Sequence, residues 1–276
     1  MSSSSVSKVR RPAVAGAFYP GRPEALRSTV DQLVAQAAPR PIHGSLRALI
    51  APHAGYVYSG PIAASAYAVL ARASPVPRRV ALLGPSHYLG FSGLALPEAE
   101  GLETPLGVVR VDPLAASLPE RFPQVIRSDR AHQREHSLEV QLPFLQRVLP
   151  AGFTVVPLAV GRAGPHEVSE VIEFLWDPPG TLVLVSTDLS HYLPADEARE
   201  MDTRTSGLVV AEDFERLDAD MACGYHPLAG LMLAARRAGF SIELLDLRNS
   251  SDTAGDPDQV VGYGAFAVVE GRSGSG

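Results

Sequence analysis

Cysteine and lysine are almost absent from this sequence, and each shortage excludes a class of chemistry. Cys223 is the only cysteine among 276 residues, so the chain forms no internal disulfide and no site built from four of its own cysteines. Lys8 is the only lysine, and it lies in a serine-rich N-terminal stretch. The folded body therefore holds neither a lysine Schiff base nor a phosphate-loop lysine.

Long apolar runs and an excess of positive charge are also missing. No apolar run approaches the roughly 20 residues that span a membrane, and the first residues lack the apolar stretch of a secretory signal. The formal net charge is −6, whereas general nucleic-acid binders are usually basic. We therefore expect a cytoplasmic protein with neither nucleic acid nor membrane as a partner.

The remaining composition is that of a globular protein, with 46% hydrophobic and 20% charged residues. A chain of this length can bury a sizeable core. We expect a single α/β domain over residues 10–270, a disordered N-terminal arm over residues 1–9 and a frayed C-terminal end over residues 271–276.

Short apolar runs alternate with amphipathic stretches along the chain, and this alternation predicts the fold class. The pattern favours a mostly parallel central sheet that is covered by helices on both faces. The predicted strands are residues 46–51, 80–83, 94–96, 108–111, 153–160, 182–185, 242–247 and 262–269. The predicted helices are residues 23–37, 62–72, 130–148 (kinked or split at Pro143), 165–175, 195–210, 214–220 and 228–238.

Three histidines follow predicted buried strands. His53, His87 and His191 each lie just beyond the carboxyl end of such a strand. Ligands of open α/β sheets bind at that edge, so we expect the three side chains to face one cleft. Neutral imidazole is the commonest metal ligand in proteins, and a third histidine at the same cleft can act as a general acid or base. Asp188 precedes His191 closely and could orient it.

Cys223 stands just before a predicted helix, where the positive end of the helix dipole favours a thiolate. A thiolate there could bind a metal, or could pair with a histidine as a nucleophile without any metal. A buried, inert cysteine is the commoner outcome for a lone cysteine.

A competing motif lies at residues 132–136, His-Gln-Arg-Glu-His, which fits the inverted zinc-protease signature H-x-x-E-H. On a helix His132 and His136 would share one face, with Glu139 as a candidate third ligand. Alternatively His136 and Glu139 face the cleft as supporting groups. The other candidates for the cleft or its supporting shell are Tyr56, Ser86, Glu135, Tyr192 and His226.

Seven segments together resemble the Memo family. They are residues 11–20, 52–56, 84–87, 135–139, 186–191, 223–224 and 262–264, and they span nearly the whole chain. The chain looks like the bacterial branch known as protein B of the AmmeMemoRadiSam system. Members of that branch are often encoded near a radical-SAM enzyme, and the resemblance therefore implies a pathway link to such an enzyme.

The family fold is similar to the catalytic subunit of class III extradiol dioxygenases, which bind non-haem iron. The resemblance implies His53 and His87 as metal ligands, Cys223 as the third ligand in place of a carboxylate, and His191 as the acid/base residue beside Asp188. One metal ion is expected, with iron favoured over copper or zinc.

The leading hypothesis is a metal-dependent oxidoreductase that acts on a small, for example aromatic, molecule. Dioxygen-activating facial triads use two histidines and one carboxylate, so the ring-cleaving activity itself does not transfer. The main alternative is a non-catalytic module that binds a peptide or metabolite in the same cleft. An H-x-x-E-H zinc hydrolase is a third hypothesis.

Overall fold

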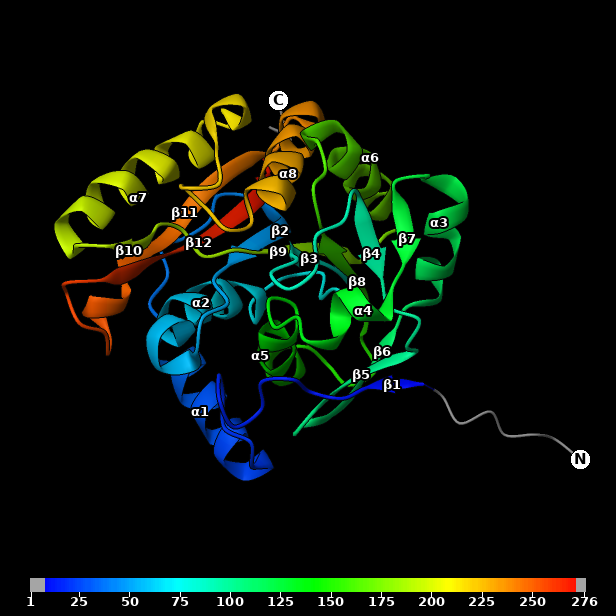
Figure 1. The fold of residues 1–276 in the computed structure, drawn as a ribbon, viewed down its shortest axis with the longest axis horizontal. Helices are drawn as coiled ribbons and strands as arrows, with labels where there is room; N and C mark the ends of the chain where they lie inside the picture. Colours follow the sequence, from blue (N-terminus) through cyan, green and yellow to red (C-terminus); the bar gives the residue numbers. More distant parts are fainter. Residues whose placement is uncertain (1–7, 272–276) are drawn as a thin grey trace, which may run out of the picture.

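The computed structural model describes residues 8–271, and within them twelve strands form one mixed sheet. The strand order along its main path is β1-β5-β6-β8-β3-β9-β2-β12-β10, with β11 paired to β12 and β4 to β7 and β8. Figure 1 shows this sheet crossing the molecule, with helices on either side. The α/β class with a parallel core that we predicted is confirmed.

The strands are β1 (Val9–Arg10), β2 (Ser45–Ala51), β3 (Arg79–Pro85), β4 (Leu94–Leu96), β5 (Gly101–Thr104), β6 (Gly107–Val111), β7 (Val125–Arg127), β8 (Thr154–Val160), β9 (Thr181–Ser186), β10 (His191–Leu193), β11 (Ser241–Asn249) and β12 (Val260–Glu270). The α-helices are α1 (Pro23–Gln36), α2 (Tyr56–Leu70), α3 (Leu118–Arg121), α4 (Asp129–Gln133), α5 (Leu142–Val148), α6 (Pro165–Trp176), α7 (Ala195–Val210) and α8 (Tyr225–Ala238). Short 3-10 turns cover Pro113–Ser117, Glu139–Gln141, Phe214–Arg216 and Ser250–Asp252. No helix in this part of the chain is long and apolar enough to cross a membrane.

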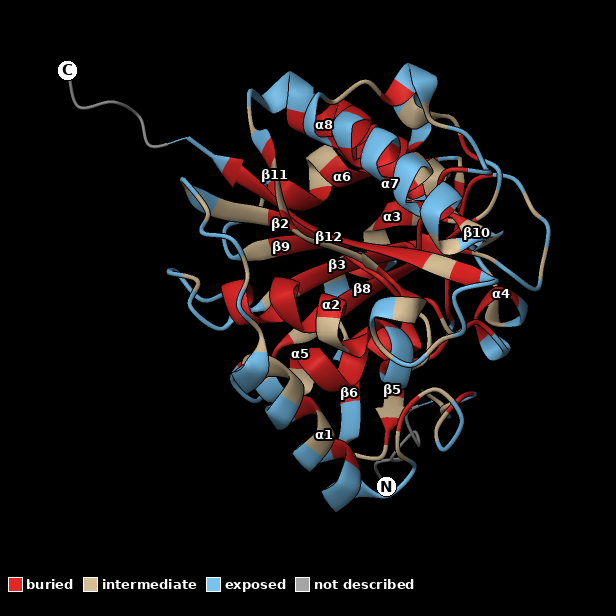
Figure 2. Cartoon of the chain, turned by 90° about the vertical axis from the view of Figure 1, so that its left-hand side faces the viewer, coloured by how far each residue is buried: buried red, intermediate tan, exposed pale blue. Residues whose placement is uncertain are grey.

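The sheet separates two hydrophobic cores because successive side chains of a strand point to opposite faces. In β2, Ala48 and Ile50 pack in the core that contains α6 and α8, whereas Leu49 and Ala51 pack in the core that contains α1, α2 and α5. Figure 2 shows the two helix layers above and below the buried strands. The central strands are apolar on both faces, which explains their continuous hydrophobic runs.

The three strands that precede the candidate residues lie side by side and run parallel. β9 lies between β3 and β2, and the register pairs Val185 of β9 with Leu83 on one side and Ile50 on the other. Their carboxyl ends therefore reach the same edge of the sheet. The chain turns away from this edge at residues 52, 86 and 187, just before or at the predicted site residues.

Most predicted elements occur within a few residues of their expected bounds. The helix predicted over residues 130–148, with a kink or split at Pro143, is split, but the break is longer than expected and begins upstream of Pro143. The chain forms α4, leaves α-helical geometry, and resumes at α5, with Pro143 in the first turn of α5. Arg10 explains the break. Its side chain donates to the carbonyl oxygens of His132 (3.0 Å) and Glu135 (2.6 Å), the groups that a continuous helix would use itself.

Two smaller expectations also change. The helix predicted over residues 214–220 is only the 3-10 turn Phe214–Arg216. Residues 1–7 of the predicted disordered arm lie outside the described residues. Val9, also predicted to be disordered, instead belongs to β1 and pairs with Gly101 of β5. The predicted C-terminal end lies outside them over 272–276.

Glu139 fastens the N-terminal segment to the body of the protein. Its fully buried carboxylate pairs with the guanidinium of Arg10 at 2.5 Å. It also accepts hydrogen bonds from the backbone N–H groups of Ala13 (2.7 Å) and Val14 (3.0 Å) and from the hydroxyl of Tyr19 (2.6 Å). Four donors from one short segment thus converge on one carboxylate.

We predict that Glu139→Ala destabilises the protein by about 3 kcal/mol or more, because it leaves the charge of Arg10 buried without its partner. The measurement is urea unfolding followed by circular dichroism. Asp31→Ala is the matched control, since the exposed Asp31–Arg147 ion pair should contribute at most about 1 kcal/mol. Equal losses in the two variants would contradict this account of Glu139.

Candidate metal site

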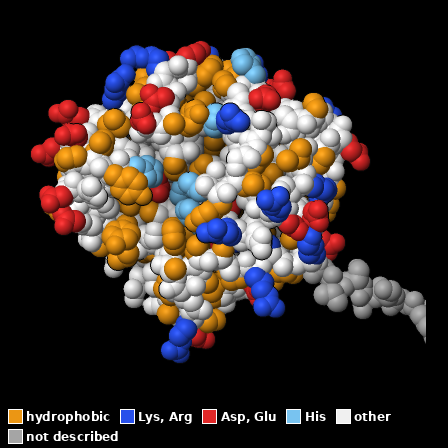
Figure 3. Space-filling view, viewed as in Figure 1, with side chains coloured by type: hydrophobic (Ala, Val, Ile, Leu, Met, Phe, Trp, Pro, Cys, Tyr) orange, Lys and Arg blue, Asp and Glu red, His pale blue; other side chains and the backbone are white. Residues whose placement is uncertain are grey.

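A cleft of about 800 Å³ opens at the carboxyl ends of β2, β3 and β9. Figure 3 looks into it and shows histidine side chains gathered in the hollow of this face. The lining residues are Phe18, His53, Ala54, His87, Tyr88, His136, Asp188, His191, Tyr192, Leu193, Met201, Ala219, Asp220, Cys223 and Val261. The cleft therefore brings together the three histidines and Asp188, which follow the strand ends, and Cys223, which precedes α8.

His53 follows β2 and is 2% exposed. Its Nδ1 lies 3.0 Å from the hydroxyl of Ser186, which donates its only hydrogen to the carbonyl of Ser137 at 2.6 Å. Nδ1 of His53 must therefore carry the proton in this contact, which leaves a lone pair on Nε2. Burial, and then the neighbouring His87, lower the pKa of His53 to about 3, so the ring is neutral.

His87 follows β3, and the carboxylate of Glu135 fixes its position. The Glu135 carboxylate accepts hydrogen bonds from the backbone N–H of His87 (2.6 Å) and from its Nδ1 (2.9 Å). Burial alone would raise the pKa of Glu135, but the contacts with His87 and the N–H groups of His87 and Ser137 outweigh it and lower the pKa to about 2. An ionised Glu135 requires a proton on Nδ1 of His87, so a neutral His87 also carries its lone pair on Nε2.

His136 comes from the segment after α4, and its side chain is 13% exposed. Its ring stacks on His87, with centroids 4.7 Å apart, and lies edge-on to His53 at 5.6 Å. Burial and the neighbouring His53 lower the pKa of His136 to about 4. Its Nδ1 is buried without a hydrogen-bond partner among residues 8–271.

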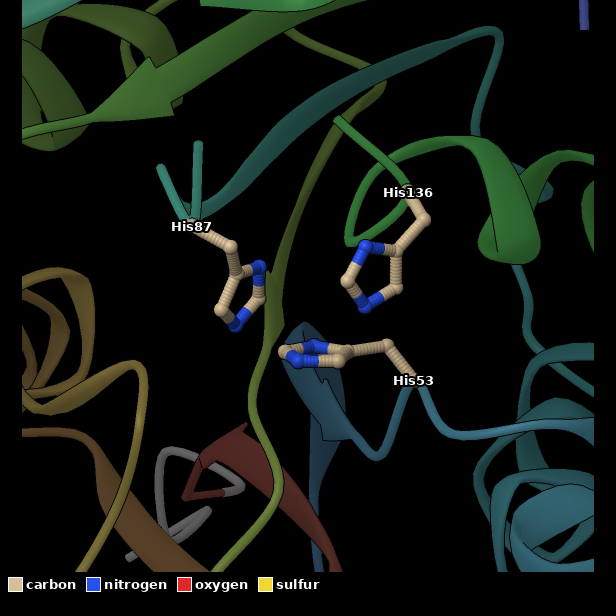
Figure 4. Close-up of side chains that lie close together, drawn as sticks. All are labelled: His53, His87 and His136. Carbon is tan, nitrogen blue, oxygen red and sulfur yellow. The ribbon is translucent and has the colours of Figure 1, made fainter. Parts of the chain in front are cut away.

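The three rings converge on one point, as Figure 4 shows. One ligand nitrogen from each of His53, His87 and His136 lies within 4.8 Å of the other two. His53 and His136 are neutral at pH 7, and among the described residues no hydrogen bond joins one of the three rings to another. Converging imidazole nitrogens suit a metal cation, and imidazole binds zinc, copper and iron. The chemistry of this donor set therefore fits a metal ion.

Cys223 lies beside this cluster, and its Sγ is 3.3 Å from Nε2 of His53. The sulfur accepts a hydrogen bond from the backbone N–H of Asp188 at 3.3 Å. The expectation that the start of α8 would favour a thiolate is wrong for the metal-free chain. Burial, and then the charge of Asp188, raise the pKa of Cys223 to about 12, so its S–H donates to His53.

Asp188 and His191 occupy the turn after β9. Asp188 is buried, accepts the backbone N–H of His53 at 2.7 Å, and has its pKa raised by that burial. His191 begins β10 and lines the same cleft. Asp188 is therefore bonded to the His53 turn, and no hydrogen bond within residues 8–271 joins it to the ring of His191.

The supporting residues proposed from the sequence divide into two groups. Tyr192 lines the cleft and Glu135 holds His87 and His136. The other four do not line it. Tyr56 donates to the carbonyl of Val140, Ser86 donates to that of Leu89, Glu139 fastens the N-terminal segment, and His226 packs against Tyr225.

The H-x-x-E-H motif does not form a helical zinc site. His132 lies in α4 and His136 beyond its end, so the two do not share a helix face. The Nε2 of His132 contacts the carbonyl of Ala95 at 2.8 Å, away from the cleft. Only the second histidine of the motif joins the cluster.

Several lining or supporting residues escaped the sequence analysis. Ser186 and Gln141, which hold His53, are polar residues in apolar surroundings, and Phe18, which packs on His136, lies in the first of the family segments. Met201 and Asp220 carry no sequence signal, because α7 and the loop before Cys223 reach the cleft only through tertiary packing.

Comparison with known proteins settles the family. The Memo-like protein model matches residues 10–267. The chain belongs to the Memo family. It is 38% identical to a MEMO1 family protein of Methanopyrus kandleri, over 95% of this chain and 99% of the relative. It is 37% identical to one of Methanosarcina barkeri, over 94% and 100%, and 34% identical to one of Aquifex aeolicus, over 93% and 97%.

The depressed pKa of Glu135 in this Memo-family chain makes stability depend on pH. The folded-state pKa of about 2 lies below the ordinary 4.5, so the ionised group stabilises the fold above pH 4.5 and this contribution is lost as the pH falls toward 2. We predict that Glu135→Gln removes about 3 kcal/mol at pH 7 and little at pH 2. Urea unfolding of metal-free protein across this pH range tests it; a pH-independent difference from the parent chain would contradict it.

The raised pKa of Cys223 predicts that its thiol reacts slowly with alkylating reagents. In metal-free protein, iodoacetamide should modify Cys223 at pH 8 at least tenfold more slowly than it does in the same chain unfolded in urea. The measurement is the alkylation rate by mass spectrometry. A rate that peaks below pH 8.5 would instead support a thiolate–imidazolium pair.

Proposed function

We propose that this Memo-family protein holds one metal ion between His53, His87 and His136 and presents it to a small molecule in the cleft. The supporting observation is the way the ring protons are placed. Ser186 and Glu135 accept hydrogen bonds from Nδ1 of His53 and His87, so that each Nε2 carries a lone pair; in the metal-free chain the lone pair of His53 accepts the S–H of Cys223. Carboxylate and hydroxyl partners behind ligand histidines are typical of metal sites, because they fix the tautomer and the ring orientation.

Cys223 is proposed as an additional ligand rather than as the third one. Its sulfur already touches the ligand nitrogen of His53, and loss of the thiol proton would bring a thiolate to a bound cation. A bound cation would also offset the desolvation that keeps the thiol protonated. His136 takes the position that the sequence had given to the cysteine.

Iron is the proposed metal, with copper or zinc as alternatives, and the proposed chemistry is redox turnover of a small molecule such as an aromatic compound. A bound redox metal supplies the electron transfer. The chain orients the ligand histidines through Ser186 and Glu135 and keeps the cleft largely apolar. His191, at the cleft wall, is placed to accept or return a proton of the bound molecule.

A second candidate is a non-catalytic binding module that uses the same cleft for a peptide or metabolite. The observation in its favour is that all three clustered ligands are histidines, without the carboxylate of dioxygen-activating triads. Metal-dependent product formation that His191→Ala abolishes would exclude it.

The decisive test is metal content, measured by mass spectrometry on protein purified anaerobically without a tag. We expect about one metal per chain, strong loss in His53→Ala and His136→Ala, and partial retention with weaker affinity in Cys223→Ala. His43→Ala is the matched control, because its ring is 79% exposed and lies outside the cleft lining.

Each outcome assigns the ligands. Unchanged metal content in His136→Ala together with complete loss in Cys223→Ala would replace our set with His53, His87 and Cys223. Absence of metal, with none taken up from added Fe(II), Cu(I) or Zn(II), would overturn the metal site and leave the cleft as a binding or thiol site.

A further inference from the structure

We propose that the cleft selects a flat aromatic ligand with a cationic substituent, which Tyr192 and Asp220 recognise. The inference deepens the proposed function, since the ligand would present its other end to the histidine cluster. It rests on the charge of the lining, the position of the aromatic rings and the backbone of Tyr192.

The cleft lining contains acidic side chains but no lysine or arginine. Asp188 is buried, and Asp220 lies on an exposed loop. Within residues 8–271 the carboxylate of Asp220 has no hydrogen-bond or ion-pair partner. Arg134 borders the lining, with its guanidinium 4.7 Å from the ring centroid of Tyr88. A cleft of one sign favours ligands of the opposite sign.

Aromatic rings stand on two sides of the cleft. Phe18 and Tyr88 flank His136, with ring centroids 4.7 and 5.9 Å from it. Tyr192 stands beside His191 at 5.8 Å and is 71% exposed. A planar group that reaches the histidine cluster therefore meets aromatic rings beside His136 and beside His191, and stacking on them adds to affinity.

The backbone of Tyr192 indicates that its placement serves binding rather than folding. Its φ is 59°, in the left-handed region that bulky residues avoid at a cost of about 1–2 kcal/mol. The exposed ring recovers little of this cost by burial. The pairing of β10 with β12 shifts register between His191 and Leu193, and such bulges re-aim side chains next to binding sites.

The charge preference is tested with Co(II)-loaded protein, whose visible spectrum first reports metal binding and then ligation by a probe. The probes are benzohydroxamates that carry a 4-aminomethyl, a 4-methyl or a 4-carboxy group. We expect affinity to fall in that order, with the amine at least about threefold tighter than the carboxylate. Asp220→Asn should remove the difference, and Asp31→Asn, a distant exposed control, should keep it.

The role of Tyr192 is tested by comparing 4-methylbenzohydroxamate with acetohydroxamate, which lacks the ring. Tyr192→Ala should reduce the preference for the aromatic probe by about threefold to tenfold, and Tyr192→Phe should retain it. An unchanged preference in Tyr192→Ala would overturn this part of the inference.

A metal-free arm separates this inference from the metal site. Saturation-transfer NMR on metal-free protein should show binding of benzylamine, weak or no binding of benzoate, and loss of the benzylamine signal in Asp220→Asn. If cobalt fails to bind while this pattern holds, only the proposed function fails. Equal binding of amine and carboxylate probes, with or without metal, would overturn the inference.

Discussion

The ionised carboxylate of Glu135 is the group on which the geometry of the site depends most. It accepts hydrogen bonds from both the backbone and the ring of His87, and from the backbone N–H groups of His136 and Ser137. A single buried charge thus joins the loop after β3 to the segment after α4. Because its donors come from both loops, the charge is compensated without an arginine or lysine, and the cleft keeps its lack of positive side chains.

A second buried carboxylate, that of Glu139, is connected to the segment that carries Glu135. Arg10 joins the two, since its guanidinium pairs with Glu139 and also donates to the carbonyl of Glu135. The same interactions bring the N-terminal segment across the body of the protein, where Phe18 packs against His136. The N-terminal segment therefore completes the wall of the cleft in which His53, His87 and His136 cluster.

Sequence reasoning located the site because apolar strands that end in a turn and a histidine have a simple geometric consequence. Parallel strands that lie side by side bring those ends to one edge, and for His53 and His87 this was sufficient. His136 could not be found in this way. Its motif predicts a helix, but the helix ends where Arg10, more than 120 residues earlier, occupies the carbonyl groups that would continue it. The thiol of Cys223 differs from expectation for a similar reason, since the burial that governs its pKa exists only in the folded chain.

Burial and the neighbouring imidazoles also explain why His53 and His136 stay neutral. Protonating His53 would place a cation beside His87 in a buried position, and the carboxylate of Asp188 lies 3.9 Å from Nε2. Protonation is therefore an unfavourable way to satisfy the converging lone pairs. The three rings lie close enough together to hold a metal ion, which could supply the positive charge that a buried proton does not. Under our proposals, the aromatic and acidic residues beyond the cluster then decide which molecule reaches it.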